Sequence, residues 1–211
     1  MADWHVQQGP FDIPDVPDFI PRRLKPYLFI FFVLIIQFSG GVYLAAASDM
    51  VGTKAVMQED ILMAGYASLI GMAINFAMMF RIKFRFSTRN QLLVSGMVLI
   101  AANVICAYTA SVPLLVGTCF VAGWFRMQAT FACNSTIQLW LTPVRDMAIF
   151  FCYVYIIVDS VIQLSGIATI YTAFFSQWEY MHWIMTGMLA LMMLMVMTAC
   201  TLLVMVMMML K

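Results

Sequence analysis

The chain has 211 residues, of which 64% are hydrophobic and only 10% are charged, and its mean hydropathy is +0.94. Soluble domains carry about 45–50% apolar and about 25% charged residues, so this composition excludes a water-soluble fold. The formal net charge is +1, and no stretch of sequence is basic enough to hold a phosphate backbone. We therefore expect no nucleic-acid partner.

Residues 1–26 are polar and punctuated by proline, which predicts an extended or disordered tail. The rest of the chain, 27–211, predicts an all-α polytopic membrane domain, because apolar runs near or above about 18 residues are long enough to cross a bilayer. The connections are short apart from 48–60 and 81–90, so any chemistry lies in or at the lipid bilayer. Six transmembrane helices are predicted, at residues 27–47, 61–80, 91–108, 112–141, 147–174 and 182–210.

The basic residues are distributed asymmetrically about these six predicted spans. Lys54 alone falls in the loops on one side, and Arg126 lies within a span. Short loops rich in Lys and Arg stay in the cytoplasm, so both termini are predicted to be cytoplasmic. The other nine basic residues fall on that side: Arg22, Arg23, Lys25, Arg81, Lys83, Arg85, Arg89, Arg145 and Lys211.

Small residues inside the spans predict close packing between helices. The glycines at 71 and 123 would let neighbouring helices approach closely.

The cysteines form no CxxC pair and have no histidine nearby, so we expect buried side chains and no metal. They are Cys106, Cys119, Cys133, Cys152 and Cys200.

Two charged residues lie at membrane depth, where each costs about 2.5–3.5 kcal/mol at mid-span unless it is paired or hydrated. Arg126 stands near the middle of the predicted 112–141 helix, and Asp159 stands near the middle of 147–174. Adjacent spans run antiparallel, so the two side chains reach similar depths. An ion pair between them is the leading structural prediction.

Three roles for Arg126 and Asp159 remain open. The pair is a static tether between two helices, because a closed pair offsets the cost of insertion. Alternatively, Asp159 leaves its partner, takes up a proton or a cationic substrate and returns, with Arg126 as the permanently charged counter-ion. In the third case, Arg126 lines a water-filled cavity and binds an anion.

Uncharged polar residues also occur inside the spans. Each one by itself is explained by interhelical hydrogen bonding, which contributes about 0.6 kcal/mol. Their concentration in the 112–141 helix makes that helix a candidate wall of an aqueous pathway. Beside Asp159 and Arg126, the candidates for a substrate or proton pathway are Gln37, Gln128, Asn134, Gln138 and Gln163.

Several features together resemble the N-terminal half of a major facilitator superfamily transporter, and more narrowly its bacterial drug:proton antiporter branch. They are six predicted spans, a basic cytoplasmic loop at 81–90, a Pro-containing loop at 142–146 and an aromatic cluster at 177–180. The family's G-x-L-a-D-R-x-G-R-R loop corresponds to 80–89, where Arg85 and Arg89 occupy basic positions. The resemblance implies that these two arginines are candidates for gating at the cytoplasmic side.

The resemblance also implies a function. Family members have two six-helix halves with substrate between them, so this chain is expected to be a fragment or to assemble with a second half. It would export small amphipathic or drug-like molecules by alternating access, with proton coupling implied by the family, in a bacterial inner (plasma) membrane. The alternative is a membrane interaction or assembly subunit that transports nothing, in which Arg126 and Asp159 are structural. We expect neither an enzyme nor a cofactor, since no HExxH or similar motif is present.

Overall fold

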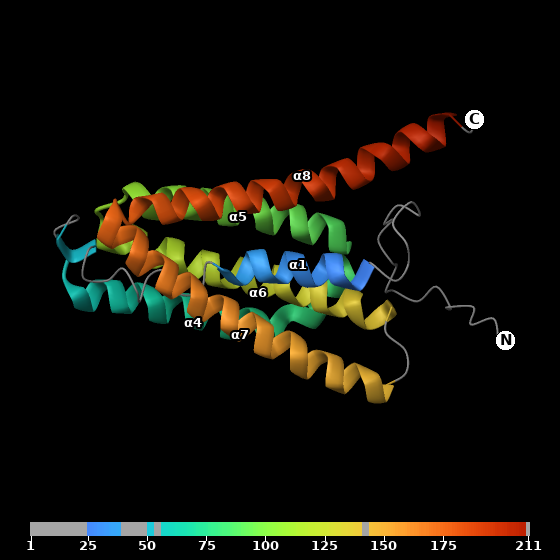
Figure 1. The fold of residues 1–211 in the computed structure, drawn as a ribbon, viewed down its shortest axis with the longest axis horizontal. Helices are drawn as coiled ribbons and strands as arrows, with labels where there is room; N and C mark the ends of the chain where they lie inside the picture. Colours follow the sequence, from blue (N-terminus) through green and yellow to red (C-terminus); the bar gives the residue numbers. More distant parts are fainter. Residues whose placement is uncertain (1–24, 39–49, 53–55, 141–143, 210–211) are drawn as a thin grey trace.

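The computed structural model describes residues 25–38, 50–52, 56–140 and 144–209, and over these residues the chain is helical with no strand. Five helices are long and apolar enough to cross a membrane, whereas the described part of the first is shorter. This is the architecture of a membrane-spanning helical bundle (Figure 1). The helices are α1 (Lys25–Phe38), α4 (Gln58–Arg85), α5 (Thr88–Tyr108), α6 (Val112–Trp140), α7 (Val144–Phe175) and α8 (Glu179–Met209).

Apart from the end of α4, the five long helices begin and end within three residues of the sequence prediction. For the first predicted span, 27–47, only the part up to Phe38 lies in the described residues. The tail, predicted to be extended or disordered, lies outside them except for its last two residues, which begin α1.

The predicted loop over 81–90 is wrong. α4 continues to Arg85, so that only Phe86 and Ser87 separate it from α5. The side chain of Ser87 caps α5 by accepting a hydrogen bond from the backbone N–H of Asn90 at 3.4 Å. The 28 residues of α4 extend for about 42 Å, which is longer than the hydrocarbon core of about 30 Å. Hydropathy finds only the apolar middle of such a helix and misses the polar turns that continue beyond it.

Consecutive long helices run in opposite directions through the bundle. The start of α1 and the ends of α4, α6 and α8 lie at the same end of the molecule, on the right in Figure 1. Three exposed arginines of α4 and α5 therefore lie at that end, namely Arg81, Arg85 and Arg89.

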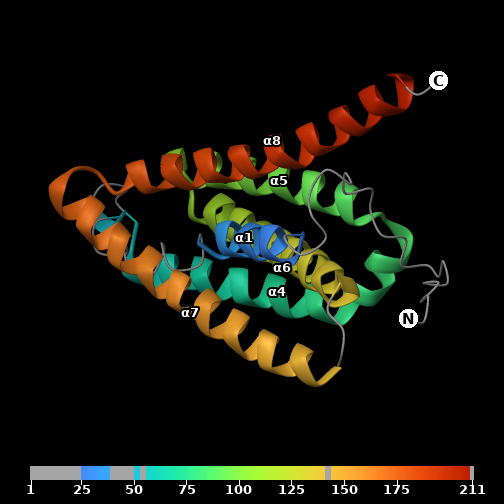
Figure 2. The same ribbon diagram turned by 45° about the vertical axis from the view of Figure 1, so that its right-hand side comes forward.

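Helix α1 occupies the centre of the bundle, where it packs against α6, α7 and α8 (Figure 2). Its side chains Val33 and Ile36 are almost completely buried. The facing part of α6 carries Ala129, Ala132 and Cys133, all fully buried. Because small side chains let two helix backbones approach, this strip of α6 makes room for the bulky residues of α1.

Helices α4 and α6 cross closely, and glycine makes this close approach possible. A Cβ atom built on Gly71 would lie 2.2 Å from the backbone oxygen of Phe120, and one built on Gly123 would lie 2.0 Å from that of Ser68. Each helix thus places a glycine against the other's backbone. The close approach predicted from these two glycines is confirmed.

Helix α7 is the least buried of the five long helices and packs against α1 and α8. Its inner face carries Val154, Val158 and Ser165. Cys152 lies outside that face and is exposed, so the prediction that it is buried is wrong. Cys106, Cys119 and Cys133 are buried as predicted, and the side chain of Cys200 lies outside the described residues.

Candidate functional site

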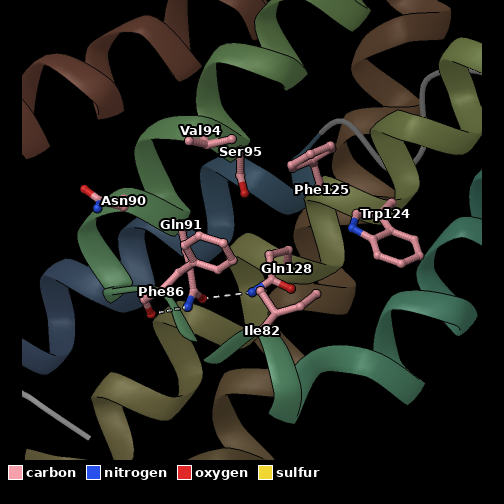
Figure 3. A pocket seen from close by; sticks show the side chains of 9 residues that line it. All are labelled: Ile82, Phe86, Asn90, Gln91, Val94, Ser95, Trp124, Phe125 and Gln128. Atoms are coloured by element: carbon pink, nitrogen blue, oxygen red, sulfur yellow. Dashed lines mark hydrogen bonds between the residues drawn. The ribbon is translucent and has the colours of Figure 1, made fainter. Parts of the chain in front are cut away.

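A chain of side-chain amides joins α4, α6 and α5 inside the bundle. Asn75 Nδ2 donates to Gln128 Oε1 at 3.1 Å, and Gln128 Nε2 donates to Gln91 Oε1 at 2.8 Å. Gln91 Nε2 then donates to the backbone oxygen of Phe86 at 2.7 Å (Figure 3). All three amide side chains are buried. The close approach of α4 and α6 at their glycines lets the short Asn75 side chain reach Gln128.

A second polar contact ties α1 to α6. Gln37 Nε2 donates to Thr130 Oγ1 at 3.0 Å, and the Thr130 hydroxyl donates to the backbone oxygen of Arg126 at 2.9 Å. Both side chains are buried. The two predicted pathway candidates Gln37 and Gln128 therefore make hydrogen bonds between helices.

The guanidinium of Arg126 lies between α6 and α4. Its Nη2 atom donates to the sulfur of Met72 at 2.9 Å, and the side chain is half-buried. A thioether is a weak acceptor, so this contact only partly replaces the hydration of a cation. Arg126 follows Gly123 by about one helical turn and thus belongs to the same α4–α6 crossing.

Asp159 lies on a different surface. It is exposed on α7, and 15 residues of that helix precede it while 16 follow. Successive helical residues are rotated by about 100°, so Asp159 points well away from the buried Val158. Gln163, one turn further on, is exposed as well. The structure places these two predicted pathway residues on one outward strip of α7.

The predicted ion pair between Arg126 and Asp159 is not formed in the part of the chain that the structure describes. Arg126 is directed towards α4, whereas Asp159 is on the exposed side of α7. Although α7 follows α6 in the sequence, it packs against α1 and α8. Similar depth in the membrane was therefore insufficient, because the two helices do not present these residues to each other.

The remaining predicted site residues are Asn134, Gln138, Arg85 and Arg89. Asn134 is half-buried on α6, and its Oδ1 atom has no hydrogen-bond partner. The side chain of Gln138 lies outside the described residues. The gating candidates Arg85 and Arg89 are exposed on either side of the two-residue connection between α4 and α5.

A cavity of about 160 Å³ lies beside the amide chain, between α4, α5 and α6. Its lining is largely apolar and includes the aromatic side chains of Phe86, Trp124 and Phe125. Gln91, Ser95 and Gln128 supply polar atoms to the same wall (Figure 3). No residue of α1, α7 or α8 is among those that line it.

Sequence reasoning did not select Gln91 and Ser95. They lie four residues apart on α5 and are therefore on one face of that helix. Two polar residues at this spacing in a largely apolar span indicate a polar face on the helix. It was missed because Gln91 stood at the predicted helix end.

The fold and these sites define a polytopic helical membrane protein with polar groups inside its bundle. No family model matches the chain, and no curated protein or solved structure matches it.

Proposed function

We propose that the chain is one half of a secondary-active transporter of the major facilitator type. It exports small amphipathic or drug-like molecules by alternating access, with protons as the coupling ion. The exposed Asp159 at the centre of α7 is the observation that carries this proposal. The sequence resemblance to that superfamily supplies the expected mechanism.

An uncovered carboxylate at mid-span is expensive in lipid, by about 2.5–3.5 kcal/mol on insertion scales for an ionised aspartate at a helix centre. Gln163 extends the same polar strip by one turn. A second six-helix half, from the same protein or from another subunit, would cover the strip and enclose water next to Asp159. Substrate and protons would then meet this carboxylate between the two halves.

The proposed orientation has both termini in the cytoplasm. Arg81, Arg85 and Arg89 are exposed at the end of the bundle where α1 begins and α8 ends. Such a concentration of arginine at one end supports a cytoplasmic location for it. Arg85 and Arg89 would there control closure between the two halves.

The experiment measures ethidium efflux from cells that express the complete open reading frame and lack their main exporters. We expect efflux that depends on a proton gradient, and we expect Asp159→Asn to reduce its rate by at least tenfold because the proton-carrying group is lost. Ser160→Ala is the matched control, since that neighbouring exposed hydroxyl only bonds to the backbone of its own helix. Equal efflux from wild type and Asp159→Asn would contradict the proposal.

The second candidate is a membrane interaction or assembly subunit without transport. It is favoured by the finding that Gln37, Asn75 and Gln128 make hydrogen bonds between helices. In that case the Asp159 strip would bind a membrane partner, and the Asp159→Asn variant would lose this partner in detergent while ethidium efflux matched that of cells without the protein.

A further inference from the structure

The cavity between α4, α5 and α6 has the volume and the lining of a site for a small ligand. Its volume of about 160 Å³ is close to the roughly 150 Å³ of an engineered apolar cavity that binds benzene. Aromatic rings of Phe86, Trp124 and Phe125 form part of its wall. A single aromatic ring therefore matches both the volume and the chemistry of this space.

One hydroxyl in the wall lacks a hydrogen bond. Ser95 has no exposed surface, and its Oγ atom has no hydrogen-bond partner. Hydroxyls inside helices usually donate to a carbonyl one turn earlier, as Ser165 and Thr169 do here. Ser95 does not, and Figure 3 shows its oxygen directed towards the space beside Gln91 and Gln128.

The neighbouring amides already have partners. Gln128 bonds to Asn75 and to Gln91, and Gln91 also bonds to the backbone of Phe86. The cavity thus requires about one further hydrogen bond, at Ser95. A water molecule needs about two to four polar partners to be held in such a place. Apart from the exposed Asn90, the remaining wall is apolar, and it carries no charged side chain, so a neutral ligand with a single polar atom is a better match.

We propose that this cavity binds a small neutral amphiphile that consists of one aromatic ring with one hydroxyl group. The ring lies among Phe86, Trp124 and Phe125, and the wall side chains shift slightly so that the ligand hydroxyl hydrogen-bonds to the buried Ser95 Oγ. The site is separate from the Asp159 strip, because neither α1 nor α7 contributes to it. The proposed ligand binding can therefore be tested independently of the proposed transport function.

The test uses 4-bromophenol as the probe, because its bromine quenches tryptophan fluorescence and Trp124 lines the cavity. The purified full chain in detergent is titrated with 4-bromophenol and, in parallel, with bromobenzene, which lacks the hydroxyl. We expect saturable quenching by both compounds, with 4-bromophenol binding more tightly. Trp124→Phe should remove the saturable component and so identify the reporter.

Two variants of Ser95 separate the hydroxyl from the space. Ser95→Ala should weaken 4-bromophenol binding by about tenfold, the equivalent of one buried hydrogen bond, and leave bromobenzene binding unchanged. Ser95→Leu should fill the cavity and abolish saturable binding of both compounds. The melting temperature of Ser95→Ala should equal or exceed that of wild type, since the hydroxyl makes no bond in the ligand-free protein.

Three results would overturn the proposal. Quenching that rises linearly with probe and is the same in wild type and Ser95→Leu would show partition into the micelle. Equal weakening of both probes by Ser95→Ala would show that the hydroxyl is not recognised. Quenching of Trp124 by phosphatidylcholine with brominated acyl chains, relieved by Ser95→Leu, would make a lipid chain the occupant.

Discussion

Gln128 connects three helices through a single side chain. It accepts a hydrogen bond from Asn75 of α4 and donates one to Gln91 of α5. A polar group inside an apolar bundle is tolerated when both its donor and its acceptor are satisfied, and it becomes costly when a partner is removed. Stability at this point therefore depends on the completeness of the amide chain.

We predict that Gln128→Met lowers the free energy of unfolding by about 1–3 kcal/mol. This is more than the roughly 0.6 kcal/mol of an average interhelical bond, because two buried partners lose their hydrogen bonds. Gln163→Met is the matched control, since Gln163 is exposed on α7, and it should change stability little. Reversible unfolding in mixed micelles measures both. A Gln128→Met protein as stable as Gln163→Met would show that the amide chain contributes nothing.

Sequence patterns located the residues of this site better than they located its contacts. Gln37 and Gln128 were selected because polar residues are rare in spans, and both make bonds between helices. The partner of Gln37 is Thr130, 93 positions along the chain. Hydropathy carries no information on such pairs, because it records the average environment of a residue and not the direction of its side chain.

At the scale of the helices, the crossing of α4 and α6 determines which polar side chains meet between these two helices. Gly71 and Gly123 bring the two backbones together, and the residues one turn along each helix, Asn75 and Arg126, then face the partner helix. An additional methyl group at either glycine would have to displace main-chain atoms, which are far less adaptable than the end of a flexible side chain.

We predict that Gly71→Ala and Gly123→Ala each destabilise the protein by about 1–3 kcal/mol or more, because the added Cβ would overlap a backbone oxygen. Gly117→Ala in α6 is the control, since nothing lies within 4 Å of its Cβ position. That control should be neutral or up to about 1 kcal/mol more stable, because alanine favours a helix. Thermal unfolding in detergent measures all three. Equal melting temperatures for all three variants would contradict the close crossing.

Over the whole molecule, alternation of helix direction sets which ends share a side of the membrane. The connection between α5 and α6, at Ser111, and that between α7 and α8, at Ser176, lie at the end opposite to Asn90. The orientation that we propose from the charge rule would place Asn90 in the cytoplasm and the two serines outside.

We predict that a membrane-impermeant maleimide labels Ser111→Cys and Ser176→Cys in intact cells, whereas Asn90→Cys reacts only after permeabilisation. All three positions are exposed at helix ends. The unmodified protein supplies the blank, because three of its described cysteines are buried and Cys152 lies within α7. Labelling of Asn90→Cys in intact cells would reverse the orientation. Labelling of Ser111→Cys and Ser176→Cys from opposite sides would contradict the helix order.

The amino-acid sequence by itself determined that the chain is a helical membrane protein and where its long helices lie. These properties depend on local quantities, because the length of an apolar run sets whether it crosses the bilayer. Only the tertiary structure decided that Arg126 faces α4 while Asp159 faces outwards, and that Gln91 and Gln128 meet beside a cavity. The reason is that helix rotation and neighbour choice arise from packing between distant segments, for which glycines and small side chains count more than hydropathy.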